Sequence, residues 1–514
     1  MASSLILGKY VITRALDRHN VEIVEDGAIY QRDGIVVEVG KSSELKEKYD
    51  ADEIIGSQTH VAMPGLVNSH HHVGLTPLQM GAVDEALEVW WLSRLGKRNV
   101  DLYLDTLYSA FELIESGVTT VQHLHNRLGG TVEQMVERAN QVIEAYDAIG
   151  MRVSYSHSVR DQNRISYISD EDYVSRLPED VGRSLSEALT RQTIPLEDNI
   201  SLFESLYRQH ESSPRVEIQL APSNLHWCSD AALELIRDCA AKYNVPMHMH
   251  LSETVYQKQY AAERSGGTAL QHLHRLGMLG PRLTVGHGVW FTEADIELAA
   301  DTGTMICHNA SSNLRVRDGV APLNAFEARG VKVAIGIDEA GLNDDRDMLQ
   351  EMRMVLNLHR EPGVHDRVPT ATQVFRMATE YGAQTTPFAS KIGTLEPGKA
   401  ADVVLVDWNA ISYPYLDRGV PILEAVLGRA KSRDVDTVIV AGQPILLNRE
   451  FTRIDRGAIL KELADSLAAP LTAEEQGRLE LSRKLRRHAP DLYEPDPMCG
   501  CGSHQPFYRM NARN

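Results

Sequence analysis

The strongest constraint on the fold is the alternation of short apolar strands with amphipathic helices through the middle of the chain. Helical stretches, for example residues 102–115, 132–148, 231–243, 292–301 and 347–358, separate strand candidates that end near Asn68, Leu124, His157, Leu220, Leu251, His287, His308 and Asp338. Such alternation is typical of parallel strands joined by crossover helices. It predicts an α/β fold built on a (β/α)8 barrel, whose chemistry lies at the carboxyl ends of the strands.

The two ends of the chain are β-rich instead. Residues 5–55 consist of short alternating strands separated by turns such as Asp33-Gly34, and further strands are expected at 403–407, 435–440 and 444–446. We therefore predict a composite β-sandwich domain from residues 1–60 and 391–450, a barrel over 61–390, and a helical C-terminal extension with a tail over 451–514. The helices of the extension are expected at 459–469 and 474–487, with a break at Pro470.

Charge and composition limit the partners. Acidic residues outnumber basic ones 71 to 52, a formal net charge of −19, which argues against a general nucleic-acid or anionic-membrane surface and favours a small neutral or cationic substrate. The basic run Arg483–Arg487 is interpreted as a solvated helix end. Neither a signal peptide nor a long apolar span is recognised, so we expect a soluble, cytoplasmic protein without a membrane partner.

The cysteines do not form a disulfide framework. There are five, and only Cys499 and Cys501, followed by His504, are clustered. This C-x-C-x-x-H pattern could in principle bind a metal, but no fourth ligand is near, and we interpret the segment as a mobile or oligomer-packing tail. The extension is expected to pack on the barrel or on a second subunit, which suggests a homo-oligomer, a dimer or larger.

Histidines mark the end of the first barrel strand, in the stretch PGLVNSHHH. Side chains alternate between the two faces of a strand, so His70 and His72 point the same way and can share one ion, whereas His71 points elsewhere. By itself the run is as compatible with a surface loop as with a metal site. The other ligands must come from other strands.

Three more strand ends carry candidates. His250 and Glu253 follow the fifth strand, and one could hold a metal while the other handles protons. His248 lies one pleat deeper and is expected to be structural, which is also the simple interpretation of a lone His287. Asp338 ends a buried apolar strand and needs a partner. Together His70, His72, His250 and Asp338 suit Zn²⁺ or Fe²⁺ with room for a water.

Five strings in this order, PGLVNSHHH, HMHLSE, VGHG, HNASSN and GTLEPGKAADVVLVD, resemble the amidohydrolase superfamily. The nearest likeness is to the branch with S-adenosylhomocysteine-type deaminases, guanine deaminase and triazine hydrolases. The resemblance spans residues 5–447 and implies a distorted (β/α)8 barrel with a composite β-sandwich. It also implies metal ligation by His70, His72, His250 and Asp338. The fourth strand, residues 216–220, ends without the lysine of two-metal relatives, which implies one divalent ion per subunit, Zn²⁺ favoured and Fe²⁺ the alternative.

The resemblance further implies the chemistry. Glu253, His287 and Asp338 match the proton-handling residues of a metal-dependent hydrolase that acts on C–N bonds other than peptide bonds. Metal-activated hydroxide would attack an electrophilic carbon while Glu253 protonates the adjacent ring nitrogen. The chain departs from the usual pattern at Glu339, which places a second carboxylate beside the site, and at Ala310, which replaces a proline.

The contacts to a small-molecule substrate are weakly determined. His125 lies at the mouth of the second strand, and Arg160 lies in a polar exit from the third that could equally be a solvated loop. Asn313, Glu339 and, less directly, His308 are further candidates near the site. Trp90 and Trp91 could form a pocket wall, or be ordinary buried aromatics.

Three functions are compatible with these residues. The first is hydrolytic deamination of an amino-substituted N-heterocycle such as a purine, a pterin or a triazine. The second keeps the site but opens a cyclic amide or releases halide or an alkylamine. The third, a silent barrel used as a scaffold, predicts lost ligands, whereas every expected position is filled.

Overall fold

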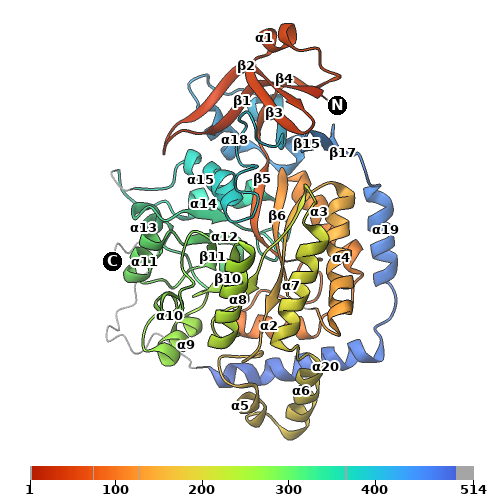
Figure 1. Ribbon diagram of the computed structural model, residues 1–514, viewed down its shortest axis with the longest axis vertical. Coiled ribbons are helices and arrows are strands. Elements are labelled where there is room, and N and C mark those ends of the chain that lie inside the picture. Colours follow the sequence, from red (N-terminus) through yellow and green to blue (C-terminus); the bar gives the residue numbers. More distant parts are fainter. Residues whose placement is uncertain (1–2, 73, 127, 365–366, 494–514) are drawn as a thin grey trace.

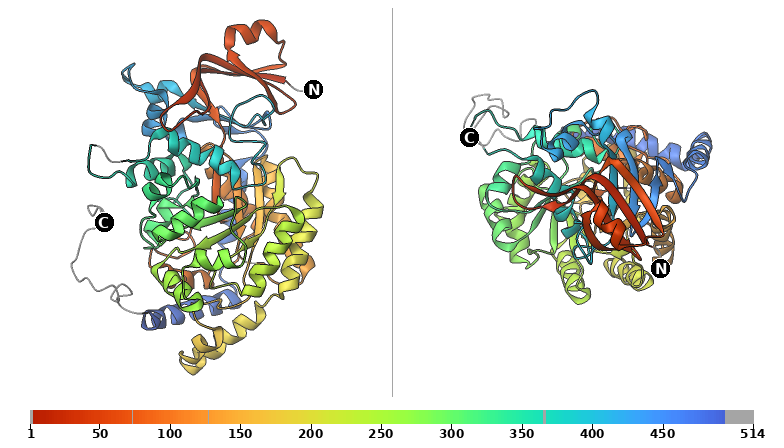
Figure 2. Two further views of the ribbon diagram at one scale, coloured as in Figure 1. Left: turned by 60° about the vertical axis from the view of Figure 1, so that its left-hand side comes forward. Right: turned by 90° about the horizontal axis from the view of Figure 1, so that it is seen from above.

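The computed structural model describes residues 3–72, 74–126, 128–364 and 367–493. A β-sheet caps one end of a barrel of strands and helices, and the pair α5–α6 lies at the opposite end (Figures 1 and 2). Of the predicted features, the Cys499/Cys501 tail lies outside the described residues. Within them, no helix is both long and apolar enough to cross a membrane.

The capping sheet combines both ends of the chain. Its strand order is β17-β16-β15-β14-β4-β1-β2-β3, and β14 pairs antiparallel with β4 where the C-terminal strands join the N-terminal ones. Apolar residues from both ends, among them Ile6, Val11, Leu405 and Ile439, form one buried cluster within it. The strands are β1 (Ser3–Ala15), β2 (Val21–Arg32), β3 (Ile35–Lys41), β4 (Glu53–Pro64), β14 (Val403–Asp407), β15 (Val435–Val440), β16 (Gln443–Leu447) and β17 (Glu450–Phe451).

Two parallel sheets form the barrel, with orders β5-β6-β7-β8 and β10-β11-β12-β13, while β9 pairs with β7. Parallel bridges between Leu220 and Met247 and between His71 and Asp338 join the sheets on both sides and close the ring. The predicted α/β fold class is confirmed. The strands are β5 (Leu66–His71), β6 (Val118–His125), β7 (Arg152–Val159), β8 (Val216–Ile218), β9 (Ala221–Pro222), β10 (Met247–Leu251), β11 (Leu283–His287), β12 (Met305–His308) and β13 (Val333–Ile335).

Helices cover the outside of the barrel, and side-chain caps fix where several of them begin. Asp101 accepts from the Leu104 amide at the start of α3, and Thr131 forms a capping box with Gln134 at the start of α4. The helices are α1 (Ser42–Lys48), α2 (Leu87–Leu95), α3 (Leu102–Glu115), α4 (Val132–Ile149), α5 (Asp170–Ser175), α6 (Glu179–Arg191), α7 (Leu196–His210), α8 (Asp230–Tyr243), α9 (Val255–Ser265), α10 (Ala269–Arg275), α11 (Glu293–Thr302), α12 (Ala310–Arg315), α13 (Leu323–Ala328), α14 (Met348–Leu358), α15 (Ala371–Ala378), α16 (Glu380–Gln384), α17 (Trp408–Ser412) and α18 (Ile422–Arg429).

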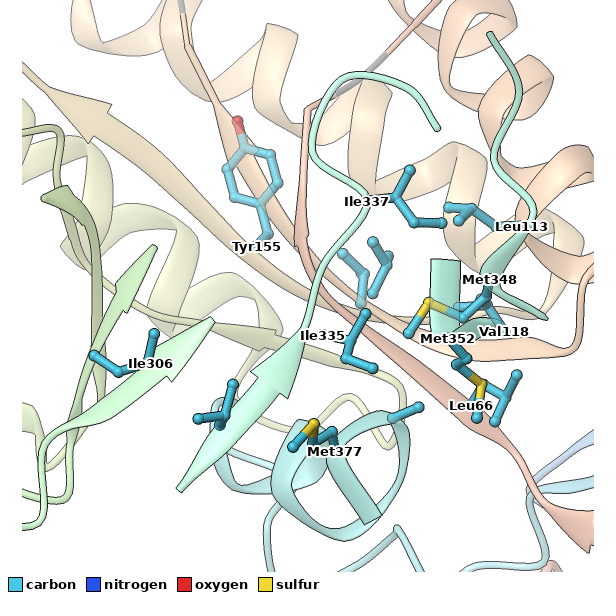
Figure 3. Packing of buried hydrophobic residues seen from close by; sticks show 14 of the residues in the cluster. Leu66, Leu113, Val118, Tyr155, Ile306, Ile335, Ile337, Met348, Met352 and Met377 are labelled. Carbon is cyan, nitrogen blue, oxygen red and sulfur yellow. The ribbon is translucent and has the colours of Figure 1, made fainter. Parts of the chain in front are cut away.

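The main hydrophobic core lies between the barrel strands and these helices. Ile335 of β13, Leu66 of β5 and Met377 of α15 belong to it (Figure 3). Because the strands are held from outside by this packing, the side chains at their carboxyl ends have fixed positions.

Two helices after the capping sheet form the C-terminal extension, α19 (Arg456–Leu467) and α20 (Ala473–His488), followed by a 3-10 turn, Ala489–Leu492. In Figure 1, α19 runs along one side of the barrel and α20 crosses its lower end. Leu463 of α19 is buried in a cluster with Leu104 of α3, and Ser482 of α20 donates to the Leu92 carbonyl of α2 at 2.8 Å. The extension therefore packs on the barrel of its own chain.

Candidate active site

Four potential ligands meet at the carboxyl ends of three barrel strands. His70 lies in β5, His72 directly follows it, His250 lies in β10 and Asp338 follows β13. One ligand atom from each lies within 4.8 Å of the others, and all four residues are buried. His72 Nε2 lies 3.1 Å and His70 Nε2 3.4 Å from Asp338 Oδ1, and His250 Nε2 lies 3.3 Å from His72 Nε2.

The opposite ring nitrogens fix the orientation of the three imidazoles. His72 Nδ1 donates to the Leu124 carbonyl at 2.7 Å, His250 Nδ1 donates to that of Ser223 at 2.9 Å, and His70 Nδ1 is hydrogen-bonded to His248 at 2.8 Å. Each Nε2 therefore faces the centre of the cluster, as in the usual support of a metal-binding histidine.

The donor set fits a divalent cation. Within the described part of the chain, the buried Nε2 of His70 makes no hydrogen bond, which is costly unless another ligand meets it. Burial lowers the pKa of His70 to about 4 and that of His250 well below its usual range, so both rings are neutral near pH 7. Burial opposes ionisation of Asp338, but contacts from His70 and His72 hold its pKa well below the ordinary value. Burial opposes protonation of His72, but the hydrogen bond to Asp338 and the charges of Glu339 and Asp338 hold its pKa above the ordinary value, so this ring would release a proton on binding a cation. Three imidazoles with one carboxylate suit Zn²⁺ or Fe²⁺.

Glycine permits this close approach of strands. A Cβ at Gly336, two residues before Asp338, would overlap the side chains of His70 and Asn309. The Asp338 amide donates to the His70 carbonyl at 2.9 Å, which brings β13 against β5. Any larger residue at 336 would push these two ligand-bearing segments apart.

His71 is not part of the four-residue cluster. It is completely buried, its ring lies 5.8 Å from that of His123, and neither ring nitrogen makes a hydrogen bond to any described residue. His248 supports His70. The alternation along β5 thus separates His71 from His70 and His72.

Glu253 and His287 flank the cluster. Glu253 Oε1 lies 3.5 Å from His287 Nε2, which lies 3.9 Å from Asp338 Oδ2. Gln257 donates to Glu253 at 3.1 Å, and His287 Nδ1 is hydrogen-bonded to Asn313 Oδ1 at 2.8 Å. Burial raises the pKa of Glu253, opposed by His287 and reinforced by Asp338, so this carboxyl retains a proton more readily than an exposed one.

A small cavity of about 40 Å³ opens on Glu253 and on the candidate ligands His72, His250 and Asp338. Among the substrate candidates, Glu339 and Arg160 line it. Glu339 forms an ion pair with Arg94 at 2.5 Å. Arg160 packs over the Trp227 ring, 3.6 Å from its centroid, and donates to Ser223 Oγ at 2.9 Å.

The other candidates lie elsewhere. Asn313 holds the far side of His287, and His125 lines a neighbouring cavity. His308 is hydrogen-bonded to His359 at 2.8 Å.

Sequence reasoning missed Ser312 and Trp227 at this cavity and Arg94 next to it. Ser312 donates to Asp338 Oδ2 at 2.6 Å, Trp227 forms a wall beside Arg160, and Arg94 neutralises Glu339. Ser312 belongs to the recognised HNASSN string and could have been found there. Nothing in the sequence near Trp227 or Arg94 indicates which residue each one contacts.

The fold and this geometry agree with comparisons to known proteins. The model of the Amidohydrolase family matches residues 61–445, and the chain belongs to this family. It is therefore a hydrolase, and its recognition from the five sequence strings is confirmed.

Among its relatives is a 5-methylthioadenosine/S-adenosylhomocysteine deaminase of Thermococcus sibiricus, 30% identical over 80% of this chain and 89% of that protein. Another is a 5'-deoxyadenosine deaminase of Methanosarcina mazei, 27% identical over 92% of this chain and 99% of that protein. A solved structure of an adenosine deaminase from Xanthomonas campestris with bound zinc is also similar, with TM-score 0.75 and 25% identity over 91% of this chain and 98% of that one.

Proposed function

We propose that this hydrolase deaminates an amino-substituted N-heterocycle with one bound divalent metal ion, Zn²⁺ favoured and Fe²⁺ the alternative. The main support for this proposal is a buried cluster of four potential metal ligands, with Glu253 and His287 beside it. The four ligands are His70, His72, His250 and Asp338. The deaminase relatives named above and the zinc in a similar solved structure support the proposal.

The metal would be held by His70, His72, His250 and Asp338. A bound divalent cation lowers the pKa of water and polarises the attacked carbon, so that hydroxide is available near neutral pH.

The protein's own residues would then move the protons. Asp338 or Glu253 would accept a proton from water, and His287, whose Nε2 lies 3.5 Å from Glu253 Oε1, would orient the attacking oxygen. Glu253 gives its proton to the ring nitrogen next to the attacked carbon, which makes that carbon electrophilic. The tetrahedral adduct would then collapse: the C–N bond breaks, the departing amino group takes the proton that water gave up and leaves as ammonia, and the hydroxyl proton returns to Glu253 as the C=O bond forms.

Ammonia release tests this function. Metal-loaded protein is incubated with aminopurine nucleosides, aminopterins and aminotriazines, and ammonia and product mass are measured. Deamination replaces NH by O, whereas the alternative, opening of a cyclic amide, adds the mass of water; loss of halide or alkylamine is separated in the same spectra. Ammonia from none of the three classes would contradict the proposal. The homo-oligomeric state and the cytoplasmic location stay predictions.

A further inference from the structure

A second cavity adjoins the candidate active site. Its volume is about 220 Å³, and His72, Trp91 and Asn126 line both cavities. It extends from the candidate metal ligands toward the segment that connects α2 with α3. A substrate whose reacting ring lies at the cluster could therefore extend a substituent past Trp91 into this side cavity.

Basic side chains outnumber acidic ones in its lining. Arg94, Lys97 and Arg98 line the side cavity, and Asp105 is the acidic residue among the described lining residues. Glu339 faces the neighbouring cavity and is paired with Arg94. Three cations against these two carboxylates leave an excess positive charge at the side cavity.

Among these three cations, Lys97 differs in having neither an ion pair nor a side-chain hydrogen bond within the described part of the chain, although the charges of Asp105 and Glu339 act on it from nearby. Arg94 has its ion pair with Glu339, and Arg98 donates to the carbonyls of Leu467 and Ala469 at 2.7 and 3.0 Å. The Lys97 ammonium makes no ion pair or hydrogen bond to the residues described in the structure. Burial, with repulsion from Arg94, lowers the pKa of Lys97. A half-buried ammonium without an ion-pair partner is partly desolvated, and a bound anion would offset that cost.

The C-terminal extension holds the segment that carries Lys97. Arg478 of α20 donates to the Lys97 carbonyl at 3.3 Å and to Asn99 Oδ1 at 2.8 Å, and Glu475 accepts from the Asn99 amide at 2.8 Å. A Cβ at Gly96 would lie 3.0 Å from Cβ of Ser482, so α2 ends in close contact with α20. The family match ends at residue 445, before these helices begin.

We propose that the side cavity is a specificity subsite for an anionic group of the substrate, a carboxylate or a phosphate, met by Lys97 and positioned by the C-terminal extension. This rests on the proposed function and narrows its substrate class to N-heterocycles that carry an anionic substituent. It departs from the neutral or cationic substrate that the net charge of −19 favours, because the charge at the side cavity is locally positive. Lysine suits either group because its ammonium acts as a point charge.

Matched substrates test the subsite. Metal-loaded wild type, Lys97→Met and the control Lys46→Met, which alters an exposed lysine of α1, are assayed with pterin and pterin-6-carboxylate and with adenosine and adenosine 5'-phosphate. We expect Lys97→Met to raise KM for the preferred anionic compound about tenfold, with kcat and the neutral partner changed by less than about twofold. The preferred pair distinguishes carboxylate from phosphate. Equal KM changes for charged and neutral partners, or wild-type preference for both neutral compounds, would overturn the subsite.

The role of the extension needs its own variant. Arg478→Gln removes the contacts to Lys97 and Asn99, and Arg487→Gln alters an exposed arginine of the same helix. We expect only Arg478→Gln to raise KM for the anionic substrate, with kcat for the neutral partner retained. A general loss of kcat, or equal effects of the two variants, would contradict a positioning role.

The anion subsite can be tested even if the protein is not a deaminase. If no compound yields ammonia, calorimetric binding of inorganic phosphate to metal-loaded protein still tests the cavity. Binding weakened about tenfold in Lys97→Met but not in Lys46→Met supports the subsite. Binding that persists unchanged in Lys97→Met is located elsewhere, for instance on the metal, and overturns it.

Discussion

The two adjoining cavities are built in different ways. The cavity at the metal cluster is lined by His72, His250 and Asp338, which lie at strand ends whose positions follow from the register of a parallel barrel. The side cavity depends on a connecting segment, residues 96–99, which is held by residues of α20 that lie 376 and 381 positions further along the chain. The positions of the candidate catalytic residues thus follow from the local periodicity of the strands. The position of the proposed specificity residue, Lys97, depends on tertiary packing of the C-terminal extension.

The largest effect on metal binding and activity should come from removing one of the two candidate ligands that alternate along the first barrel strand. His70→Ala or His72→Ala should lower bound metal strongly and activity on the order of a thousandfold or more, because the ion that activates water loses a ligand. His71→Ala, the adjacent control, should keep its metal, since His71 lies outside the cluster. Elemental analysis of the purified variants measures this. Equal metal loss in all three would disprove the proposed division of roles.

The difference between the two cavities also explains which site residues could be predicted from the sequence. His70, His72, His250 and Asp338 were predicted as one set because period-2 alternation and strand ends are visible in the sequence, and the structure brings all four together. Helix bounds were close where a cap is present: α3 was expected at 102–115 and spans Leu102–Glu115, starting after Asp101. The domain boundaries stay predictions.

The substrate wall could not be predicted in this way. Arg94 and Glu339 are far apart in the sequence, and no local pattern indicates that they pair. His125, predicted to contact the substrate at the strand mouth, lines the side cavity and not the smaller one, so its contact with a substrate stays a prediction. Such contacts depend on how whole elements pack, which periodicity does not encode.

A smaller effect should follow from Glu253→Gln, which keeps the shape of the side chain but removes its proton chemistry. We expect kcat to fall about 10²- to 10⁴-fold, the usual contribution of a general acid–base residue, with metal content and KM retained. Single-turnover kinetics with elemental analysis measure both. Loss of metal in this variant would instead identify Glu253 as a ligand.

The ion pair at the boundary of the two cavities should affect stability more than chemistry. Arg94→Met leaves the buried Glu339 without its cation and should destabilise the fold by about 3 kcal/mol. Arg94→Met with Glu339→Gln should recover most of that loss, because no charge is then left unpaired. Calorimetric melting of the metal-loaded variants compares them. If the double variant is no more stable than Arg94→Met, the pair is not coupled.

Two carboxyl groups, one near the metal cluster and one in the C-terminal extension, should make stability depend on pH in opposite directions. Both effects should be smaller than those above. Burial raises the pKa of Glu351 to about 7. The Glu351 carboxyl group accepts hydrogen bonds from the amide and the hydroxyl group of Ser311, beside the metal cluster. Hydrogen bonds from the Thr472 and Asn99 amides lower the pKa of Glu475 in the extension to about 2. Both start from an ordinary value of 4.5.

The direction of each pH effect depends on whether the folded or the unfolded state binds the proton more tightly. The folded state holds the Glu351 proton more tightly than the unfolded state, so this stabilisation is complete below pH 4.5 and is lost as the pH rises through 7. Glu475 stabilises above pH 4.5 and loses its contribution as the pH falls toward 2. Between pH 5 and 8, Glu351→Gln should therefore gain melting temperature relative to wild type by a few degrees. Glu475→Gln should stay below wild type by a constant amount, because its carboxylate is ionised throughout that range. Parallel pH profiles for the two variants would mean that the cluster region and the extension respond to protons alike, contrary to the difference in how they are built.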